Sequence, residues 1–374
     1  MEVKEFVKVL NKDFYTGVPD SQLKALCNYL INTYGIDKNH HMICANEGNC
    51  VALGAGYYLA TGKVPVIYMQ NSGEGNIINP IASLTNEKVY NLPQIYVIGW
   101  RGKPGVHDEP QHIFQGEITL KLLEVMNIEY FVIKSDTTTL ELKNKMESFE
   151  NILASGRSVA FVVEKDALTY DEKTKYENDN SITREEVIEH IVKYSKNDPI
   201  VSTTGKASRE LFEIRERNND IHDRDFLTVG SMGHASSIAL GIKNVKEKTR
   251  VWVIDGDGAA LMHMGSMAYI GKTNPKKFVH IVINNEAHET VGGMPTASTS
   301  IDFCKIAKAC NYKKVFKIDN FSDLDMALDY ASKANGLTFI EIKTNIASRK
   351  DLGRPTTTAR ENRDNFVKYL KTCR

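Results

Sequence analysis

The sequence of 374 residues has no excess of either charge, because 47 lysines and arginines balance 47 aspartates and glutamates. It therefore lacks the global basic field that favours nucleic acid or an anionic membrane as a partner. No apolar run reaches the length of a membrane span, and the charged N-terminal segment MEVKEFVKVLNKDF has no signal-peptide core. We expect a cytoplasmic protein that binds neither nucleic acid nor membranes.

Cysteine is scarce, and none of the six cysteines forms a C-x-x-C pair. Several lie in apolar segments, which favours buried free thiols in a reducing compartment over disulfides or a metal site. Hydrophobic residues make up 42% of the chain and charged residues 25%, as in soluble globular proteins. The length predicts more than one domain.

Apolar, β-branched runs alternate with helix-length segments along the whole chain. This alternation predicts parallel sheets with helices on both faces, that is, an α/β fold with doubly wound sheets. The expected strands are 41–45, 64–69, 94–100, 130–134 and 159–164 in the first half, and 200–203, 226–229, 251–254, 278–284, 314–318 and 338–342 in the second.

A polar segment separates the two halves. Residues 171–180 (DEKTKYENDN) are strongly charged, as expected of a surface linker. Thr183 and Glu186 then form a capping box that begins an amphipathic helix. We expect one domain over residues 1–168, a linker over 169–182 and a second domain over 183–374.

Two expected strand ends in the second half carry oxygen ligands. Asp257 lies in the sequence Asp-Gly-Asp-Gly after the run 251–254, and Asn284-Asn285 ends the run 278–284. Two parallel strands joined by a crossover helix would place these ends side by side. A carboxylate and an amide oxygen at one edge suit a hard divalent cation that also binds a phosphate, and the glycines let the backbone approach that phosphate.

This pattern resembles the metal–diphosphate motif of thiamine diphosphate enzymes, in which GDG is followed at this spacing by NN. The resemblance implies that Mg²⁺ is bound by Asp257, Asn285 and the backbone oxygen of Ala287, with Gly258 and Ala259 beside the diphosphate. Mn²⁺ accepts the same ligands and stays an alternative.

The first half carries a candidate catalytic carboxylate. Glu47 follows the run 41–45 and begins an Ala/Gly/Leu-rich helix that Gly62 closes. A carboxylate in such an apolar setting should be poorly solvated, which raises its pKa. The segment NEGNCVALGAGYYLATG is similar to the Glu segment of the same family, so the resemblance implies that Glu47 shares a proton with the cofactor's aminopyrimidine ring. The alternative is an acidic residue stabilised by the helix dipole.

The two ends of the cofactor thus fall on different domains. The resemblance implies a pyrimidine-type first domain and a diphosphate-type second domain, both of the thiamine diphosphate-binding fold. In related enzymes these domains come from different subunits. We therefore expect a homo-oligomer with its active sites at the subunit interface.

A glycine-rich turn, GSMGHA at residues 230–235, begins a helix after the run 226–229, and its amides can bind a phosphate. By resemblance, Met232 supports the bent cofactor, with Gly233 beside it; a core-filling role is the alternative. His234 either contacts the diphosphate or caps the helix. Thr204 and Gly205, after the run 200–203, are weaker candidates for the same phosphate pocket.

Several segments resemble phosphonopyruvate and sulfopyruvate decarboxylases in particular: GVPDS at 17–21, YMQNSG at 68–73, GWRG at 99–102, DEPQH at 108–112 and GSMGHASSIALGI at 230–242. The C-terminal segment DLGRPTTT at 351–358 is similar to the phosphonopyruvate branch. The resemblance implies decarboxylation of 3-phosphonopyruvate, a small 2-oxoacid, to phosphonoacetaldehyde and CO₂. Sulfopyruvate decarboxylation, or another thiamine diphosphate-dependent 2-oxoacid decarboxylation or carboligation, is the alternative.

A phosphonate requires cations and hydrogen-bond donors. Ser21 and Arg101 are candidates in the first domain, although Arg101 could instead pair with Asp108 or Glu109. Arg349 and Arg354 belong to a basic stretch of the polar tail that either covers the phosphonate or is simply solvated.

His112 belongs to the expected loop 102–112, which contains two prolines. It is our candidate for the proton relay that follows the loss of CO₂. A purely structural role for this histidine is the alternative.

Overall fold

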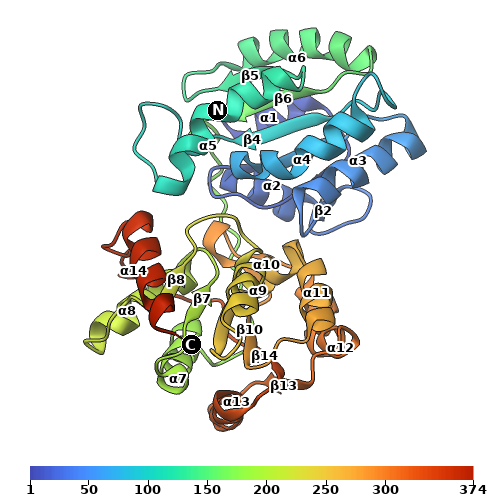
Figure 1. The fold of residues 1–374 in the computed structure, drawn as a ribbon. Coiled ribbons are helices and arrows are strands. Elements are labelled where there is room, and N and C mark those ends of the chain that lie inside the picture. Colours follow the sequence, from blue (N-terminus) through green and yellow to red (C-terminus); the bar gives the residue numbers. More distant parts are fainter. Residues whose placement is uncertain (374) are drawn as a thin grey trace. The chain divides into compact units, whose positions relative to one another are not determined.

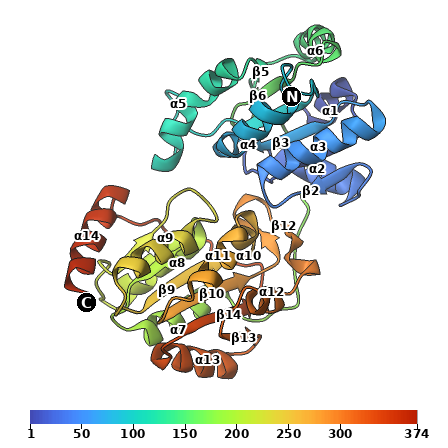
Figure 2. The same cartoon turned by 45° about the vertical axis from the view of Figure 1, so that its right-hand side comes forward.

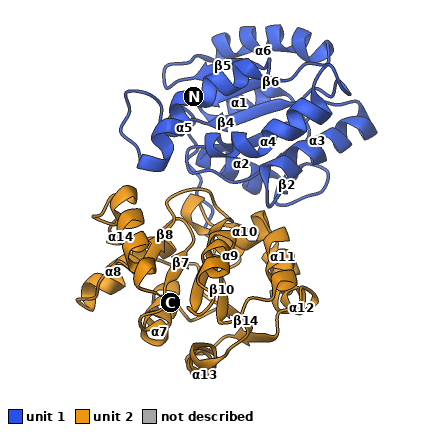
Figure 3. Cartoon of the chain, viewed as in Figure 1, with its two compact units in different colours: residues 1–175 blue, residues 176–374 orange. Residues whose placement is uncertain are grey.

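The computed structural model describes residues 1–373, and the chain divides into two compact units, Met1–Lys175 and Tyr176 onward (Figure 3). The boundary falls within the segment 169–182 that we expected to be a linker. Each unit contains one six-stranded parallel sheet with interleaved helices, so the predicted α/β fold with two doubly wound sheets is confirmed. No helix in the described part of the chain is both long and apolar enough to cross a membrane.

In unit 1 the strands lie in the spatial order β2 (His41–Ile43), β1 (Tyr15–Gly17), β3 (Val66–Gln70), β4 (Ile95–Gly99), β6 (Val159–Val163) and β5 (Glu129–Ile133). The helices between them are α1 (Val3–Leu10), α2 (Lys24–Tyr34), α3 (Glu47–Thr61), α4 (Glu74–Pro80), α5 (Pro110–Val125) and α6 (Thr139–Ala154) (Figure 1). A 3₁₀ turn, η1 (Asn71–Gly73), precedes α4, and a π-helical turn, η2 (Ile81–Thr85), follows it. The strand order changes direction between β1 and β3, which makes the crevice at their carboxyl ends the expected ligand site.

In unit 2 the order is β13 (Lys314–Ile318), β14 (Leu337–Lys343), β10 (Phe278–Asn284), β9 (Val251–Gly256), β7 (Ile200–Ser202) and β8 (Asp225–Leu227). The helices are α7 (Arg184–Ser195), α8 (Lys206–Arg217), α9 (Ala235–Val245), α10 (Asp257–Met262), α11 (Gly265–Thr273), α12 (Phe303–Ala309), α13 (Phe321–Lys333) and α14 (Ala359–Thr372). A small hairpin of β11 (Ala287–His288) and β12 (Met294–Pro295) follows β10, with the 3₁₀ turns η3 (Glu289–Val291) and η4 (Ala297–Ser300). Here the order changes direction between β7 and β9.

The sheet of unit 2 is covered on both faces. Helices α7, α8 and α13 pack on one face with Trp252 and Ile254, and α9, α11 and α12 pack on the other with Val251 and Val253 (Figure 2). Successive side chains of a strand point to opposite faces, so a strand buried on both faces reads as a continuous apolar run. This is why the run 251–254 could be recognised in the sequence.

All eleven expected strands are present, with ends that shift by one or two residues. Strand β1 and the β11–β12 hairpin were not among the expected strands. The expected loop 102–112 is wrong at its end, because Pro110 is the first residue of α5 and His112 lies inside that helix. The capping box of Thr183 and Glu186 is confirmed.

Two smaller predictions also hold. Gly62 ends α3 in the left-handed conformation with φ 69°. Within residues 1–373 all six cysteines are free thiols, three of them buried.

Candidate active site

A cavity of about 100 Å³ lies in unit 2 at the carboxyl ends of β7, β9 and β10. These strands are neighbours on either side of the point where the strand order reverses, and Ile283 of β10 pairs with Gly256 of β9. The cavity brings together seven residues singled out in the sequence: Thr204, Met232, Asp257, Gly258, Ala259, Asn285 and Ala287. Gly205, Gly233 and His234 adjoin these residues in the chain but are not part of the cavity wall.

Asp257 is the first residue of α10, and its side chain is 3% exposed. Its Oδ2 accepts hydrogen bonds from Thr296 Oγ1 at 2.5 Å and from Ser298 Oγ at 2.8 Å. Burial raises the pKa of the Asp257 carboxyl, although both hydroxyls act in the opposite direction. A buried carboxyl of this kind favours a nearby cation, which would remove the cost of its negative charge.

Asn285 and Ala287 are oriented by a sharp turn of the backbone. Glu286 between them has φ 63°, in the left-handed region that non-glycine residues seldom adopt. The Asn285 Oδ1 atom accepts the Ala287 amide at 3.1 Å, and its Nδ2 donates to Glu289 Oε2 at 3.2 Å. The Asn285 carbonyl accepts from Asn178 Nδ2 at 3.0 Å.

Charged side chains that the sequence analysis missed also line the cavity. Glu289 accepts from Lys206 Nζ at 2.8 Å and pairs with Arg184, which also donates twice to Glu210. Burial acts to raise the pKa of Glu289, but Arg184 and Lys206 outweigh it and lower that pKa. Lys206 follows the turn Thr203–Gly205 at the start of α8, a position that could have been recognised as a phosphate site.

The cavity fits a hydrated cation and a phosphate. Asp255 is 1% exposed and lines the wall, and its Oδ1 has no hydrogen-bond partner among residues 1–373. A ligand or a cation-bound water would supply the missing donor. Gly233 has φ 86°, and a Cβ there would lie 2.8 Å from the Ala259 carbonyl oxygen, so glycine lets the turn 230–235 approach α10 closely.

His234 occupies the N-cap position of α9, but its side chain makes no capping hydrogen bond. Its Nδ1 contacts Ser231 Oγ at 2.9 Å, and its ring lies 4.1 Å from that of His263. His288, which the sequence analysis missed, lines the cavity instead, and burial lowers its pKa to about 4. It is therefore neutral at physiological pH.

In unit 1, Glu47 is the first residue of α3 and is 5% exposed. The Asn46 side chain caps the helix by accepting the Gly48 amide at 2.8 Å. Asn76 Nδ2 donates to Glu47 Oε2 at 2.7 Å, and a Cβ on Gly73 would lie 2.6 Å from Oε1. Burial raises the pKa of the Glu47 carboxyl despite the Asn76 hydrogen bond, as expected from its sequence context.

The structure brings Ser21 and Arg101 together at the carboxyl ends of β1 and β4. Arg101 Nη1 donates to Ser21 Oγ at 3.2 Å, and its Nε donates to Asp108 Oδ2 at 2.7 Å. Asp108 is thus the ion-pair partner of Arg101, and the guanidinium holds the pKa of that carboxyl well below its usual range, even though partial burial acts in the opposite direction.

Two further titratable groups, one half-buried and one fully buried, lie in the same part of unit 1. The pKa of His112 is lowered by burial and then by Arg101, and its Nδ1 has no hydrogen-bond partner within the described chain. Asp20, which the sequence analysis did not single out, is fully buried and accepts from Gln70 Nε2 at 2.6 Å. Burial raises the pKa of the Asp20 carboxyl to about 6.

The two arginines of the tail do not line the cavity of unit 2. Arg349 donates to Glu185 at 2.7 Å and to Asp351 at 3.2 Å and also contacts Glu213, so its charge is neutralised within the unit. Arg354 is exposed in the segment 352–355, which has no regular secondary structure.

Comparison with known proteins gives the same picture for both units. The family described as "Thiamine pyrophosphate enzyme, N-terminal TPP binding domain" matches residues 3–142, and "Thiamine pyrophosphate enzyme, C-terminal TPP binding domain" matches residues 203–342. The phosphonopyruvate decarboxylase of Streptomyces viridochromogenes is 32% identical over 95% of this chain and 91% of its own length. That of Streptomyces hygroscopicus is 31% identical over 91% and 86%, and the sulfopyruvate decarboxylase of Methanosarcina acetivorans is 27% identical over 91% and 90%.

Proposed function

Because the chain belongs to the thiamine pyrophosphate (thiamine diphosphate) enzymes of the phosphonopyruvate decarboxylase family, we propose that it converts 3-phosphonopyruvate to phosphonoacetaldehyde and CO₂. The observation that carries the proposal is that one chain contains both Glu47, buried at a strand end of unit 1, and the cavity at Asp257 in unit 2. A non-catalytic relative would be expected to lack one of these two parts.

We propose that unit 2 binds the diphosphate together with Mg²⁺ or Mn²⁺. Asp257, the Asn285 side chain and the Ala287 carbonyl would bind the cation, since all three line one cavity and offer oxygen ligands. Backbone amides of the turns at 204–205, 232–234 and 258–259 would bind the diphosphate. When bound, the thiazolium ring of the cofactor accepts the electron pair that the departing CO₂ leaves behind.

In unit 1 the role of Glu47 is to exchange a proton with the aminopyrimidine ring. Asn76 donates to Oε2, so that oxygen acts as an acceptor and the proton is carried on Oε1. Burial raises the pKa of Glu47, which favours the protonated form that this exchange requires. The buried environment also excludes water from this transfer.

The distal phosphonate is assigned to Ser21 and Arg101, because Arg101 Nη1 and Ser21 Oγ lie 3.2 Å apart at one edge of the sheet. His112, with an unpartnered buried Nδ1 within the described residues, is proposed as the proton donor after CO₂ leaves. Arg349 and Arg354 are not assigned to the substrate, since Arg349 is already paired with carboxylates and neither lines the cavity.

We propose a homo-oligomer in which Glu47 of one subunit serves the cavity of another. Unit 1 exposes large apolar side chains on α3, α4 and α5, namely Leu59 (71% exposed), Ile78 (40%), Ile113 (49%) and Phe114 (68%). Large apolar side chains are often exposed where proteins meet, and a second copy of the chain is the occupant that the split active site requires. A cytoplasmic location would keep the six thiols reduced.

The function is tested by following CO₂ and aldehyde release from phosphonopyruvate, sulfopyruvate and pyruvate with thiamine diphosphate and Mg²⁺. We expect the largest kcat/KM for phosphonopyruvate. A larger kcat/KM for sulfopyruvate would move the assignment to the alternative substrate. No turnover of any 2-oxoacid would refute the decarboxylase proposal.

A further inference from the structure

A chain of hydrogen bonds in unit 2 leads away from Oδ2 of Asp257. It begins with Thr296 and Ser298, which precede and occupy the turn η4 and are 5% and 1% exposed. Both hydroxyls contact the same oxygen, Asp257 Oδ2, and they lie 2.6 Å from each other. Two donors on one oxygen restrict rotation of the carboxylate about its Cβ–Cγ bond.

The chain continues through Asn284, the fully buried last residue of β10. Its Oδ1 accepts from the Glu286 amide at 3.1 Å and lies 3.1 Å from Ser298 Oγ, whose single proton is shared between this oxygen and Asp257 Oδ2. Its Nδ2 donates to Glu341 Oε1 at 2.8 Å. Because donors face one end of the amide and a carboxylate faces the other, only one orientation of Asn284 satisfies all its partners. The fixed orientation of Asn284 thereby restricts the position of the Ser298 hydroxyl.

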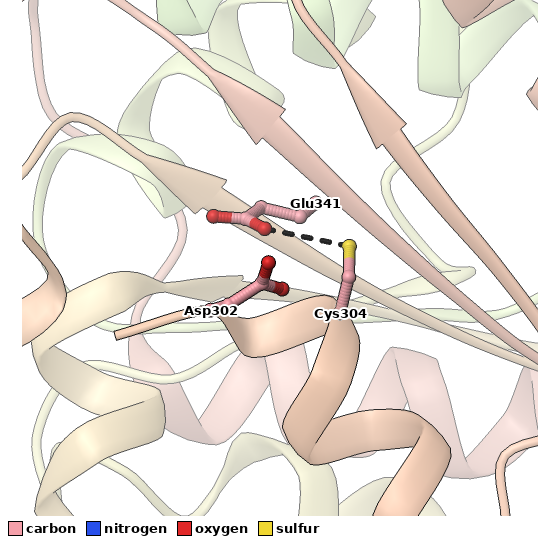
Figure 4. Close-up of side chains that lie close together, drawn as sticks. All are labelled: Asp302, Cys304 and Glu341. Carbon is pink, nitrogen blue, oxygen red and sulfur yellow. Dashed lines mark hydrogen bonds between the residues drawn. The ribbon is translucent and has the colours of Figure 1, made fainter. Parts of the chain in front are cut away.

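Glu341, on β14, ends the chain beside Cys304 and Asp302 (Figure 4). The ligand atoms of these three residues lie within 4.8 Å of one another, a spacing that a metal ion could use. The hydrogen bonding of the cluster is complete without a metal. Glu341 Oε2 accepts from the Cys304 thiol at 3.4 Å, and burial raises the pKa of that thiol to about 12, so the thiol keeps its proton in the metal-free protein.

The remaining contacts of Asp302 also favour a cluster without a metal ion. Asp302 Oδ1 accepts the Lys305 amide at 2.9 Å as the N-cap of α12, and Lys317 Nζ lies 3.9 Å from Oδ2. A positive charge next to the carboxylate opposes binding of a second cation. The cluster is therefore the buried end of the hydrogen-bond chain.

On the basis of the proposed function, we propose that Thr296 and Ser298 are positioning residues for the cation site, and that Asn284 and Glu341 hold Ser298 in place. The two hydroxyls occupy Oδ2 and leave Oδ1 of Asp257 as the oxygen presented to the cation. Groups that orient a metal ligand in this way commonly contribute about 10- to 100-fold to metal affinity.

The test measures Mn²⁺ affinity by electron paramagnetic resonance on the full chain with thiamine diphosphate present. Thr296→Val and Ser298→Ala should each weaken Mn²⁺ binding about tenfold, and the double variant about 100-fold. Thr296→Ser and Ser298→Thr keep a hydroxyl and should stay within about twofold of the parent. Ser300→Ala is the matched control, because Ser300 lies in the same turn and is exposed, and its hydroxyl donates to the Ala297 carbonyl rather than to Asp257.

The far end of the chain is tested by Glu341→Gln and Glu341→Ala. Gln retains an acceptor for Asn284 and should change Mn²⁺ affinity little, whereas Ala should weaken it about tenfold. Folding of each variant is checked by circular dichroism, and Thr296→Val keeps the proposal testable if a Glu341 variant does not fold.

Folded hydroxyl-free variants that bind Mn²⁺ as the parent does would overturn the positioning proposal. So would zinc that copurifies with the parent and is absent from Cys304→Ser. A parent protein that binds no Mn²⁺ with the cofactor present would instead refute the proposed function, so the two failures are distinguishable.

Discussion

Asn76 donates a hydrogen bond to Oε2 of Glu47 across 2.7 Å, on the side of the carboxyl away from the proposed proton-carrying oxygen. The amide thus fixes the carboxyl without taking its proton. Glu47→Gln should retain the cofactor and lose turnover by about 100-fold or more, because Gln cannot exchange a proton. Calorimetric binding of thiamine diphosphate and single-turnover kinetics separate the two effects, and a variant with parental turnover would contradict the role.

The buried carboxyl of Glu74 should make the free energy of unfolding depend on pH. Its side chain is fully buried, and burial raises its pKa to about 8, although the nearby Thr119 hydroxyl acts to lower it. A raised carboxyl pKa stabilises the fold fully below the unfolded value of about 4.5, and this contribution is lost as the pH rises towards 8. The free energy of unfolding falls by at most about 5 kcal/mol over this range, because each pKa unit between the unfolded and folded values corresponds to about 1.36 kcal/mol.

Glu74→Gln cannot ionise, so its melting temperature should fall less than that of the parent between pH 5 and pH 8.5. The exposed Glu147→Gln on α6 is the control and should follow the parent. Identical pH profiles for Glu74→Gln and the parent would show that the Glu74 carboxyl does not ionise over this range.

Mixed subunits test whether Glu47 and Asp257 act in trans. Glu47→Gln and Asp257→Ala should each be nearly inactive alone. If each site combines the two residues from different subunits, a randomly mixed dimer population recovers about a quarter of the parental activity, since half the dimers carry one intact site. Mixing after denaturation and refolding, followed by an activity assay, measures this recovery, and no recovery would place both residues in one chain.

Arg101→Met tests the distal anion site. Loss of the charged donor beside Ser21 should raise KM for phosphonopyruvate about tenfold and leave pyruvate little affected, because only phosphonopyruvate carries the second anion. Arg349→Met is the control, since that guanidinium is already paired with Glu185 and Glu213. An equal effect of Arg101→Met on both substrates would mean that it acts by disturbing the loop held by Asp108.

The long buried strands were predictable, and with them the meeting of Asp257 and Asn285 in one cavity, because β9 and β10 are apolar on both faces and end at recognisable turns. Strand β1, Tyr-Thr-Gly, was not, since it does not lie in an apolar, β-branched run. Pro110 was read as a loop residue, although proline is equally suited to the first position of a helix.

Side-chain partners set by the tertiary fold could not be foreseen. Thr296 and Ser298 lie 39 and 41 residues from Asp257 along the chain, in a segment without helix or strand periodicity. The pairing of Arg349 with Glu185 and Glu213 likewise depends on how α7 and α8 pack. Charge and spacing identified these residues as polar, but only the fold determines which of them meet.

The close contact between Gly73 and Glu47 limits which substitutions position 73 can accept. The space that any larger side chain would need there is already taken by the carboxyl of Glu47, 2.6 Å away. An alanine would force that carboxyl or the turn η1 to move, although position 73 performs no chemistry. Tolerance to substitution at position 73 is therefore set by the Glu47 carboxyl at the start of α3. A screen of all amino acids at position 73 for decarboxylase activity should favour glycine, because a larger side chain would displace that carboxyl.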